Sequence, residues 1–245
     1  MGKNIKLTIA YDGTNYSGWQ KQPNAPTIQE TIEESICQLT GETVELIGSG
    51  RTDAGVHALG QVANFHTEAT IPADKIKYAL NTKLPEDIRI IDSEQVAFDF
   101  NSRFSSKRKT YMFQILNKKI NDPFINRYAW QIPYKLDVDK MTKAIRDLEG
   151  EHDFKAFMAS GSEVKSTIRE IFSTQIIKEQ NIIKIKITGN GFLYNMVRIV
   201  VGSLVEIGAD NKSREIFKQA MTQLDRNILG ITAPAKGLFL EKVEY

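Results

Sequence analysis

The residue types best suited to chemistry lie in one glycine-rich segment, residues 48–58. Three glycines within eight residues surround Arg51 and Asp53, and a hydrophobic, strand-like run lies on either side. Because glycine adopts positive φ angles at no steric cost, such a segment can turn sharply and let a ligand approach its backbone. Arg51 can bind a phosphate, and Asp53 can supply a carboxylate for catalysis. A polar turn whose aspartate binds its own backbone would have the same composition, since neither GxG nor RTD is diagnostic alone.

The other chemistry-bearing residue types argue against a metal site or a disulfide framework. The single cysteine, Cys37, excludes an intramolecular disulfide and a multi-cysteine zinc site. The three histidines, His57, His66 and His152, lack metal-ligand spacing, so no metal is predicted. No nucleotide-binding motif is present either, and we expect the protein to need no cofactor.

Two features bear on where the protein works: its N-terminus and one long apolar stretch. The N-terminus enters a strand-like pattern directly, without the segments of a signal peptide, which predicts a cytoplasmic protein. Residues 187–205 are numerous enough to span a membrane, but their glycines, asparagines and Arg198 favour a buried core helix instead. Because an unpaired buried cation is costly, we expect Arg198 to bind an acidic loop residue or a phosphate.

Positive charge is concentrated near the middle of the chain. The formal net charge is only +2, but residues 100–121 contain no acidic residue. Such a segment can be a solvated face, or it can neutralise the phosphate backbone of a nucleic acid. Its basic residues are Arg103, Lys107, Arg108, Lys109, Lys118 and Lys119.

Hydrophobic periodicity in the first part of the chain predicts the order βαββαβ. Residues 5–11 alternate apolar and polar side chains as a half-buried strand does, and Thr27 with Glu30 forms a capping box for a helix. The predicted elements are a strand at 5–11, a helix at 27–39, strands at 43–47 and 61–66, a helix at 73–84 and a strand at 88–91.

The rest of the chain predicts the same order with one added helix. The expected elements are a strand around 111–115, a helix at 138–148, strands at 168–177 and 182–188, helices at 192–207 and 213–224, and a strand at 238–245. We therefore predict an α+β (mixed α/β) protein with two ferredoxin-like halves, residues 1–104 and 105–245. Because the basic segment joins the halves, we expect their antiparallel sheets to flank a central basic cleft.

Several segments, in order along nearly the whole chain, resemble one known family. The run GSGRTDAGVHALGQVANFHT at residues 48–67 resembles the signature of the tRNA pseudouridine synthase A (TruA) family. The runs YDGTNYSGWQ at 11–20 and NMVRIVVGSL at 195–204 resemble the same family. So do RFSS at 103–106, followed by Tyr111, and GLFL at 237–240.

This resemblance implies an isomerase that converts uridine to pseudouridine in the anticodon arm of tRNA, commonly at tRNA positions 38, 39 and 40. Asp53 matches the aspartate on which the family's reaction depends. Its carboxylate would act as a nucleophile, or would stabilise positive charge at C1′ and assist proton removal, the latter in a glycal-type route. The reaction needs no redox change or energy input, which agrees with the expectation of no cofactor and no metal.

The resemblance also implies roles for residues around Asp53 and for RNA contacts. Arg198 would form an ion pair with Asp53, and Arg51 would bind a phosphate. Tyr111 would stack on the target base, although a core-facing strand aromatic would have the same spacing. Leu238 and Leu240 would form an apolar wall under the uracil. The backbone contacts would come from Lys21, Arg103, Lys107, Arg108, Lys109 and Arg127.

The family resemblance further implies base flipping, recognition of RNA shape, and a homodimer in which each tRNA contacts both chains. Two departures affect RNA contacts rather than Asp53: Arg108-Lys109-Thr110 stands where relatives often carry an arginine earlier, and residues 193–195 replace histidines of some relatives. His57 and His66 are expected to be structural, with His57 bonding loop backbone.

Two other classes of protein are compatible with parts of the sequence. A non-catalytic RNA-binding module would also combine ferredoxin-like sheets with aromatic residues. A phosphate-handling enzyme would use the glycine-rich segment as an anion cradle, but the sequence lacks the lysine and metal-binding carboxylates of that chemistry.

Overall fold

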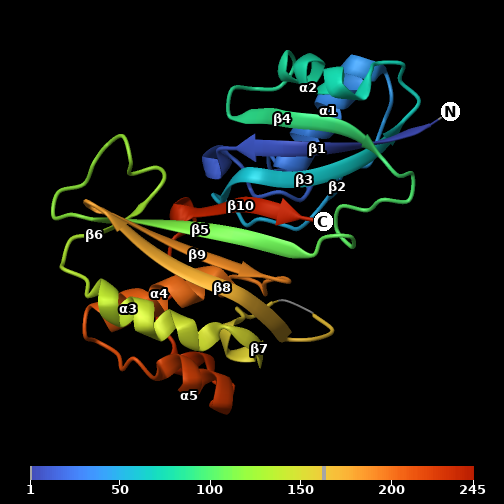
Figure 1. Ribbon diagram of the computed structural model, residues 1–245. Helices are drawn as coiled ribbons and strands as arrows, with labels where there is room; N and C mark the ends of the chain where they lie inside the picture. The colour runs from blue at the N-terminus through green and yellow to red at the C-terminus, as the bar shows by residue number, and fades with distance from the viewer. Residues whose placement is uncertain (1, 162–163) are drawn as a thin grey trace. The chain divides into compact units, whose positions relative to one another are not determined.

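The computed structural model describes residues 2–161 and 164–245, and the chain divides into two compact units (Figure 1). Unit 1 contains Met1–Lys107 and Phe239–Tyr245, and unit 2 contains Arg108–Leu238. The sequence assigned the last strand to the second half, residues 105–245. In the structure this strand belongs to unit 1 from Phe239 onward, because it pairs with a strand of that unit. Unit 1 therefore consists of two separate stretches of sequence.

The sheet of unit 1 is built around its first strand, β1. This strand lies between β3 and β4 and is antiparallel to both, with Ile5 opposite Phe65 and Gln95. β2 is antiparallel to β3, so the strands lie in the order β4-β1-β3-β2, as a ferredoxin-like βαββαβ unit requires. The bounds are β1 (Lys3–Tyr11), β2 (Ile47–Gly48), β3 (His57–Thr67) and β4 (Ile88–Val96).

Two helices of unit 1, α1 (Ile28–Thr40) and α2 (Ala73–Asn81), pack beside each other and connect these strands (Figure 1). Thr27 caps the start of α1, since its side chain accepts a hydrogen bond from the Glu30 backbone N–H, which is one of the two bonds of a capping box. Alternate residues of β1 and one face of α1 are fully buried, and this apolar layer is the core of the unit. The periodicities of the sequence thus predicted both elements correctly.

The strand predicted at 43–47 is almost absent, because only Ile47–Gly48 joins the sheet. Side chains of α1 bind the backbone of Leu46 instead. The Glu33 carboxylate accepts from Leu46 N at 3.0 Å, and the Gln29 amide donates to Leu46 O at 3.2 Å. Backbone groups that are satisfied by helix side chains do not need a neighbouring strand.

One edge of β3 is shared by two strands. β2 pairs with it at Asn64 and Ala63, whereas β10 (Leu238–Glu244) pairs with it in parallel at His57 and Ala58. This second pairing explains why β3 begins at His57 rather than at the predicted residue 61. The segment between Gly48 and His57 therefore begins where β2 pairs with Asn64 and Ala63 of β3, and it ends at the start of β3, where β10 pairs.

The sheet of unit 2 has β9 between β5 and β8, antiparallel to both. The short strands β6 and β7, which the sequence did not predict, pair with β5 and β8 respectively. The remaining strands and the helices were predicted with shifted ends. The bounds are β5 (Arg108–Asn117), β6 (Trp130–Ile132), β7 (Gly150–Asp153), β8 (Ile168–Glu179), β9 (Ile182–Gly189), α3 (Val138–Ile145), α4 (Met196–Gly208) and α5 (Ile216–Gln223).

Helix α4 is the apolar helix predicted from residues 192–207, and nearly all of its residues are buried. It begins four residues later than predicted because Asn195 has a left-handed φ of 61°, which interrupts a helix. Within the described part of the chain, the structure contains no helix with the length and apolar character needed to cross a membrane. Among residues 2–161 and 164–245 there are also short 3-10 helices at Gly13–Asn15, Arg146–Leu148, Lys155–Phe157, Arg226–Ile228 and Ala235–Gly237.

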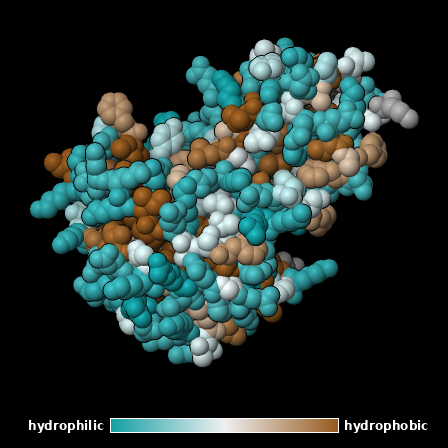
Figure 2. All heavy atoms as spheres, viewed as in Figure 1, coloured by the Kyte–Doolittle hydropathy of each residue, from teal (hydrophilic) through white to brown (hydrophobic). Residues whose placement is uncertain are grey.

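On the face shown in Figure 2, hydrophilic residues cover most of the surface, and hydrophobic residues gather in a few patches. Several large apolar side chains are exposed among the described residues, with Phe104, Ile120 and Phe124 the most exposed of them. Single exposed apolar residues are common, so each is informative only together with the local backbone and its neighbours.

Candidate active site

The segment that carries Arg51 and Asp53 is the loop between β2 and β3, and its first half is fastened to β3. Ser49 N donates to Val62 O at 2.8 Å, and the Ser49 hydroxyl donates to Gln61 Oε1 at 2.6 Å. The Gln61 amide in turn donates to Gly50 O at 2.9 Å. Ser49 and Gln61 are both buried, so these bonds are shielded from competing water.

The centre of the loop is held by the segment that follows β1. Trp19 N donates to Thr52 O at 3.0 Å, and the hydroxyls of Tyr11 and Thr52 are hydrogen-bonded at 2.8 Å. Burial raises the pKa of Tyr11, so its phenol stays protonated at neutral pH. Thr52 points inward, whereas Arg51 on one side is exposed and Asp53 on the other is half-buried. The loop therefore presents its two charged side chains from a fixed backbone.

The turn after Asp53 and the segment against it both depend on glycine. Val56 N donates to Asp53 O at 3.1 Å, and Gly55 within this turn has a φ of +75°. Opposite the turn, Gly18 has a φ of +95°, and a Cβ there would lie 2.5 Å from Thr52 O. Since real Cβ atoms do not approach a backbone oxygen so closely, the two segments can touch only with glycine at this position.

His57 closes the loop, and its environment is structural as predicted. Its Nδ1 accepts from Gly13 N at 3.1 Å and lies 3.1 Å from Asp12 Oδ1. The first contact requires a neutral ring, because a protonated Nδ1 cannot accept, whereas an ion pair with Asp12 requires the protonated ring. The buried imidazole also stacks on Phe239 with 4.8 Å between ring centroids. His57 thereby joins the end of the loop to β10.

The basic turn at Arg103 is prepared by buried polar groups of unit 1. Asn64 Oδ1 accepts from Ser102 N at 2.8 Å, and the Tyr245 hydroxyl donates to Ser102 O at 2.9 Å. Burial raises the pKa of Tyr245 to about 12, which keeps this donor protonated at neutral pH. Asn101 Oδ1 accepts from the N–H groups of Arg103 and Phe104, so this exposed turn has a defined backbone.

In unit 2, the candidate residues are Tyr111, Arg198 and Leu238. The half-buried Tyr111 lies on β5 and meets Phe192 edge-on, with 5.1 Å between centroids. Arg198 lies in the first turn of α4, where its Nε donates to Ala233 O at 2.7 Å and its Nη1 to Asn195 Oδ1 at 2.6 Å. Two hydrogen bonds fix the plane of the guanidinium, so this cation is positioned rather than mobile.

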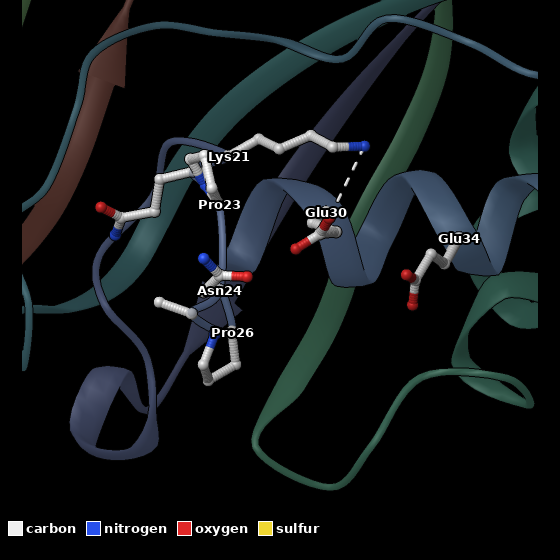
Figure 3. Close-up of a pocket in the computed structure, with 8 residues that line it drawn as sticks. Lys21, Pro23, Asn24, Pro26, Glu30 and Glu34 are labelled. Carbon is white, nitrogen blue, oxygen red and sulfur yellow. Dashed lines mark ion pairs between the residues drawn. The ribbon is translucent and has the colours of Figure 1, made fainter.

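Lys21, another of the predicted phosphate ligands, forms ion pairs with carboxylates of α1, and Figure 3 shows the one with Glu30. Its ammonium lies 3.6 Å from Glu30 and 3.7 Å from Glu33. It also lines a surface depression at the start of α1 together with Glu30 and Glu34. Phosphates are repelled by such a group of carboxylates, which argues against Lys21 as an RNA contact.

Comparisons with known proteins decide the family of this chain. The family model described as tRNA pseudouridine synthase matches residues 7–105 and 144–245. The chain belongs to the tRNA pseudouridine synthase family. A tRNA pseudouridine synthase A from Thermoanaerobacter sp. (strain X514) is 48% identical over 243 residues, 99% of this chain and 100% of the relative. One from Caldicellulosiruptor bescii is 50% identical over 243 residues with the same coverage.

Solved structures add little to this assignment. An archaeal box H/ACA sRNP Nop10-Cbf5 complex has a TM-score of 0.36 and 10% identity, covering 82% of this chain and 43% of that chain. This likeness is too weak to bear on the fold. The resemblance to the tRNA pseudouridine synthase family that the sequence indicated is nevertheless confirmed by the matches along the whole chain.

The residues predicted for a tRNA pseudouridine synthase fall into two sets by unit. Unit 1 holds Arg51, Asp53 and Leu240 together with Lys21, Arg103 and Lys107, and unit 2 holds Tyr111, Arg198 and Leu238 together with Arg108 and Lys109. Arg108 covers the Phe172 ring at 4.9 Å, which uses its planar face. Among the described residues there is no group of three or more His, Cys, Asp or Glu that could hold a metal ion.

The sequence did not point to the residues that hold the loop, among them Tyr11, Thr52, Ser49 and Gln61. Each has an ordinary polar or aromatic side chain within a strand pattern or a turn. Their place in the family-like runs at 11–20 and 48–67 gave them no role, and the one physical signal was Gln61 in an otherwise apolar strand, since a buried amide requires nearby partners.

Proposed function

We propose that this protein isomerises uridine to pseudouridine in the anticodon arm of tRNA, at positions 38, 39 and 40, with Asp53 as the catalytic residue. The observation that supports this most is similarity at 48–50% identity along essentially the whole chain to proteins named tRNA pseudouridine synthase A. Asp53 lies in the middle of the matched region, on a loop whose backbone is held on both sides.

The reaction exchanges one bond at C1′ for another. The bond from C1′ to N1 of uracil breaks, the base turns, and a bond from C1′ to C5 forms. C5 loses its proton and N1 gains one, so atoms and electrons balance without an external reagent. The Asp53 carboxylate would either attack C1′ or take a proton from the ribose in a glycal-type route.

The held loop favours either route for the same physical reason. A carboxylate on a fixed backbone has little orientational freedom to lose when the substrate reacts. Thr52 is bonded through both its carbonyl and its hydroxyl, so its neighbour Asp53 cannot shift without breaking buried bonds. This arrangement is what an enzyme that uses a single carboxylate requires.

The other residues complete the proposal. Arg198 would form an ion pair with Asp53 and keep it ionised, while the exposed Arg51 would bind a phosphate. Tyr111 would stack on the flipped uracil, and Leu238 and Leu240 would line its pocket. As in the family, we propose that the protein acts as a homodimer in the cytoplasm.

The decisive experiment is to incubate the protein with an unmodified tRNA transcript and map pseudouridine by position. We expect new pseudouridine in the anticodon arm and at no other site. Protein that binds the transcript but forms no pseudouridine there would disprove the proposed function.

Substitution of the basic residues is expected to separate real phosphate contacts from surface charge. Arg103→Gln should lower the slope of log affinity against log salt by about 0.7–0.9, because one phosphate contact is lost. Lys21→Gln should lower it much less, since Glu30 and Glu33 already neutralise that ammonium. Binding titrations with tRNA over a series of salt concentrations measure both.

The control for this comparison is Lys83→Gln, which removes another exposed positive charge of unit 1. It should leave the slope unchanged. Equal slopes for all three variants would show that the contribution of Arg103 comes from net charge alone.

A further inference from the structure

The connection between β5 and β6, residues 118–129, exposes the most accessible large apolar side chain of the described residues. Phe124 is 88% exposed, and Ile120 in the same connection is 77% exposed. The connection forms a long loop beyond the end of β5 in Figure 1. A phenylalanine can bury roughly 150–250 Å² of surface, so leaving it in water forfeits considerable stabilisation.

The backbone around Phe124 is ordered, which distinguishes this residue from one on a loose loop. Asp122 begins a tight turn: its carboxylate accepts from Phe124 N at 3.0 Å. Its carbonyl accepts from Ile125 N at 3.2 Å and from Asn126 N at 2.8 Å. Pro123 fixes its own φ at the first position of the turn. The turn therefore holds the ring of Phe124 outward.

Side chains of unit 2 fasten both ends of the connection. The Gln131 amide donates to Lys118 O at 3.1 Å and to Lys119 O at 3.0 Å. At the other end, Lys236 Nζ donates to Asn126 Oδ1 at 2.9 Å. The conformation that exposes Phe124 is thus stabilised by bonds outside the turn itself.

The exposed charges of this connection are positive. Lys118, Lys119 and Arg127 are exposed, and the Asp122 carboxylate, the one acidic side chain of residues 118–129, accepts a hydrogen bond from Phe124 N. An exposed aromatic ring in a segment with exposed cations is a combination with which proteins bind unpaired nucleotides. The ring stacks on a base, and the cations bind the adjoining phosphates. A docking protein would favour an apolar patch with fewer lysines.

The connection lies outside the two stretches that match the family model, residues 7–105 and 144–245. The family match therefore assigns it no role. We propose that Phe124 stacks on an unpaired nucleobase of the tRNA, other than the target uridine, while Lys118 and Lys119 bind the phosphates beside it. This inference rests on the proposed function, because tRNA is the RNA concerned.

The test compares Phe124→Ala with Phe124→Trp in tRNA binding over a salt series. Loss of one stacked base should weaken tRNA affinity about 5- to 150-fold for Phe124→Ala, without changing the salt slope. Phe124→Trp should bind as well as the original protein, because tryptophan also stacks. Lys118→Gln should instead lower the salt slope by about 0.7–0.9.

Tyr78→Ala is the matched control, since Tyr78 is a 62% exposed aromatic beside Lys75 and Lys77 on α2. It should bind tRNA normally. If Phe124→Ala left the tRNA affinity of an active protein unchanged, the inference would be overturned. It would also be overturned if light scattering showed that Phe124→Ala converts a dimer to a monomer, because the weaker binding would then come from the lost dimer. Failure of the proposed function is distinguishable from both, because the original protein would then form no pseudouridine.

Discussion

Asp53→Asn is expected to bind tRNA with unchanged affinity and to form almost no pseudouridine. Asparagine has nearly the same shape as aspartate, and the loop is held by the backbone of residue 53 and by Thr52. The substitution removes the negative charge and the proton-accepting oxygen. Because a positioned acid–base group contributes about 10²–10⁴-fold, the single-turnover rate should fall by that factor.

The matched control is Asp99→Asn, which makes the same change in charge at an exposed residue of unit 1. It should leave both binding and rate as they are. An Asp53→Asn variant that retained the full rate would exclude a chemical role for this carboxylate, and the glycine-rich loop would then be only a structural turn.

Gly18→Ala is expected to have the second largest effect, although residue 18 carries no side chain that could react. A Cβ at this position would lie 2.5 Å from Thr52 O, so the backbone that carries Asp53 must move. A displacement of about 1 Å of a catalytic group lowers rates roughly 10²-fold. Strain from the positive φ should also lower the free energy of unfolding by about 1–2 kcal/mol.

Gly41→Ala separates these two effects. Gly41 has a φ of +76°, but a Cβ there would meet nothing within 4 Å. Its free energy of unfolding should fall by a similar 1–2 kcal/mol, while the rate of the folded protein stays unchanged. Urea unfolding and single-turnover kinetics on both variants provide the comparison. If Gly18→Ala and Gly41→Ala lowered the rate by the same factor, the close approach of residue 18 to Thr52 would not be the cause of the slower reaction.

Much of the fold followed from local periodicity, and the errors have a common origin. The period-2 and period-3.6 patterns predicted β1, α1 and α2, because one face of each is buried regardless of its partners. Helix α4 was predicted from its apolar composition, and nearly all of its residues are buried. The short strands β6 and β7 exist only through pairing with distant residues, so their own sequence carries no signal. The absence of a strand at 43–46 likewise depends on Glu33 and Gln29, which bind Leu46 from α1.

In the candidate site, too, some residues could be predicted from the sequence and others could not. The loop around Asp53 was recognisable because glycine, arginine and aspartate at close spacing are informative as residue types. The residues that hold this loop were not recognisable. Gly18, for example, is required because of its close contact with Thr52, more than thirty residues further along the chain. Likewise, nothing in the sequence of residues 239–245 shows that they complete the sheet of unit 1. A parallel pairing of two residues leaves no periodic trace.

The discontinuity of unit 1 has a consequence for synthesis. The ribosome makes β3 early, but its edge at His57 receives Phe239 and Leu240 only after the whole of unit 2 has been made. Until then, the imidazole at the end of the Asp53 loop lacks the ring on which it stacks. A chain that stops before Phe239 therefore lacks one of the contacts that close the Asp53 loop, although it already contains every residue of that loop.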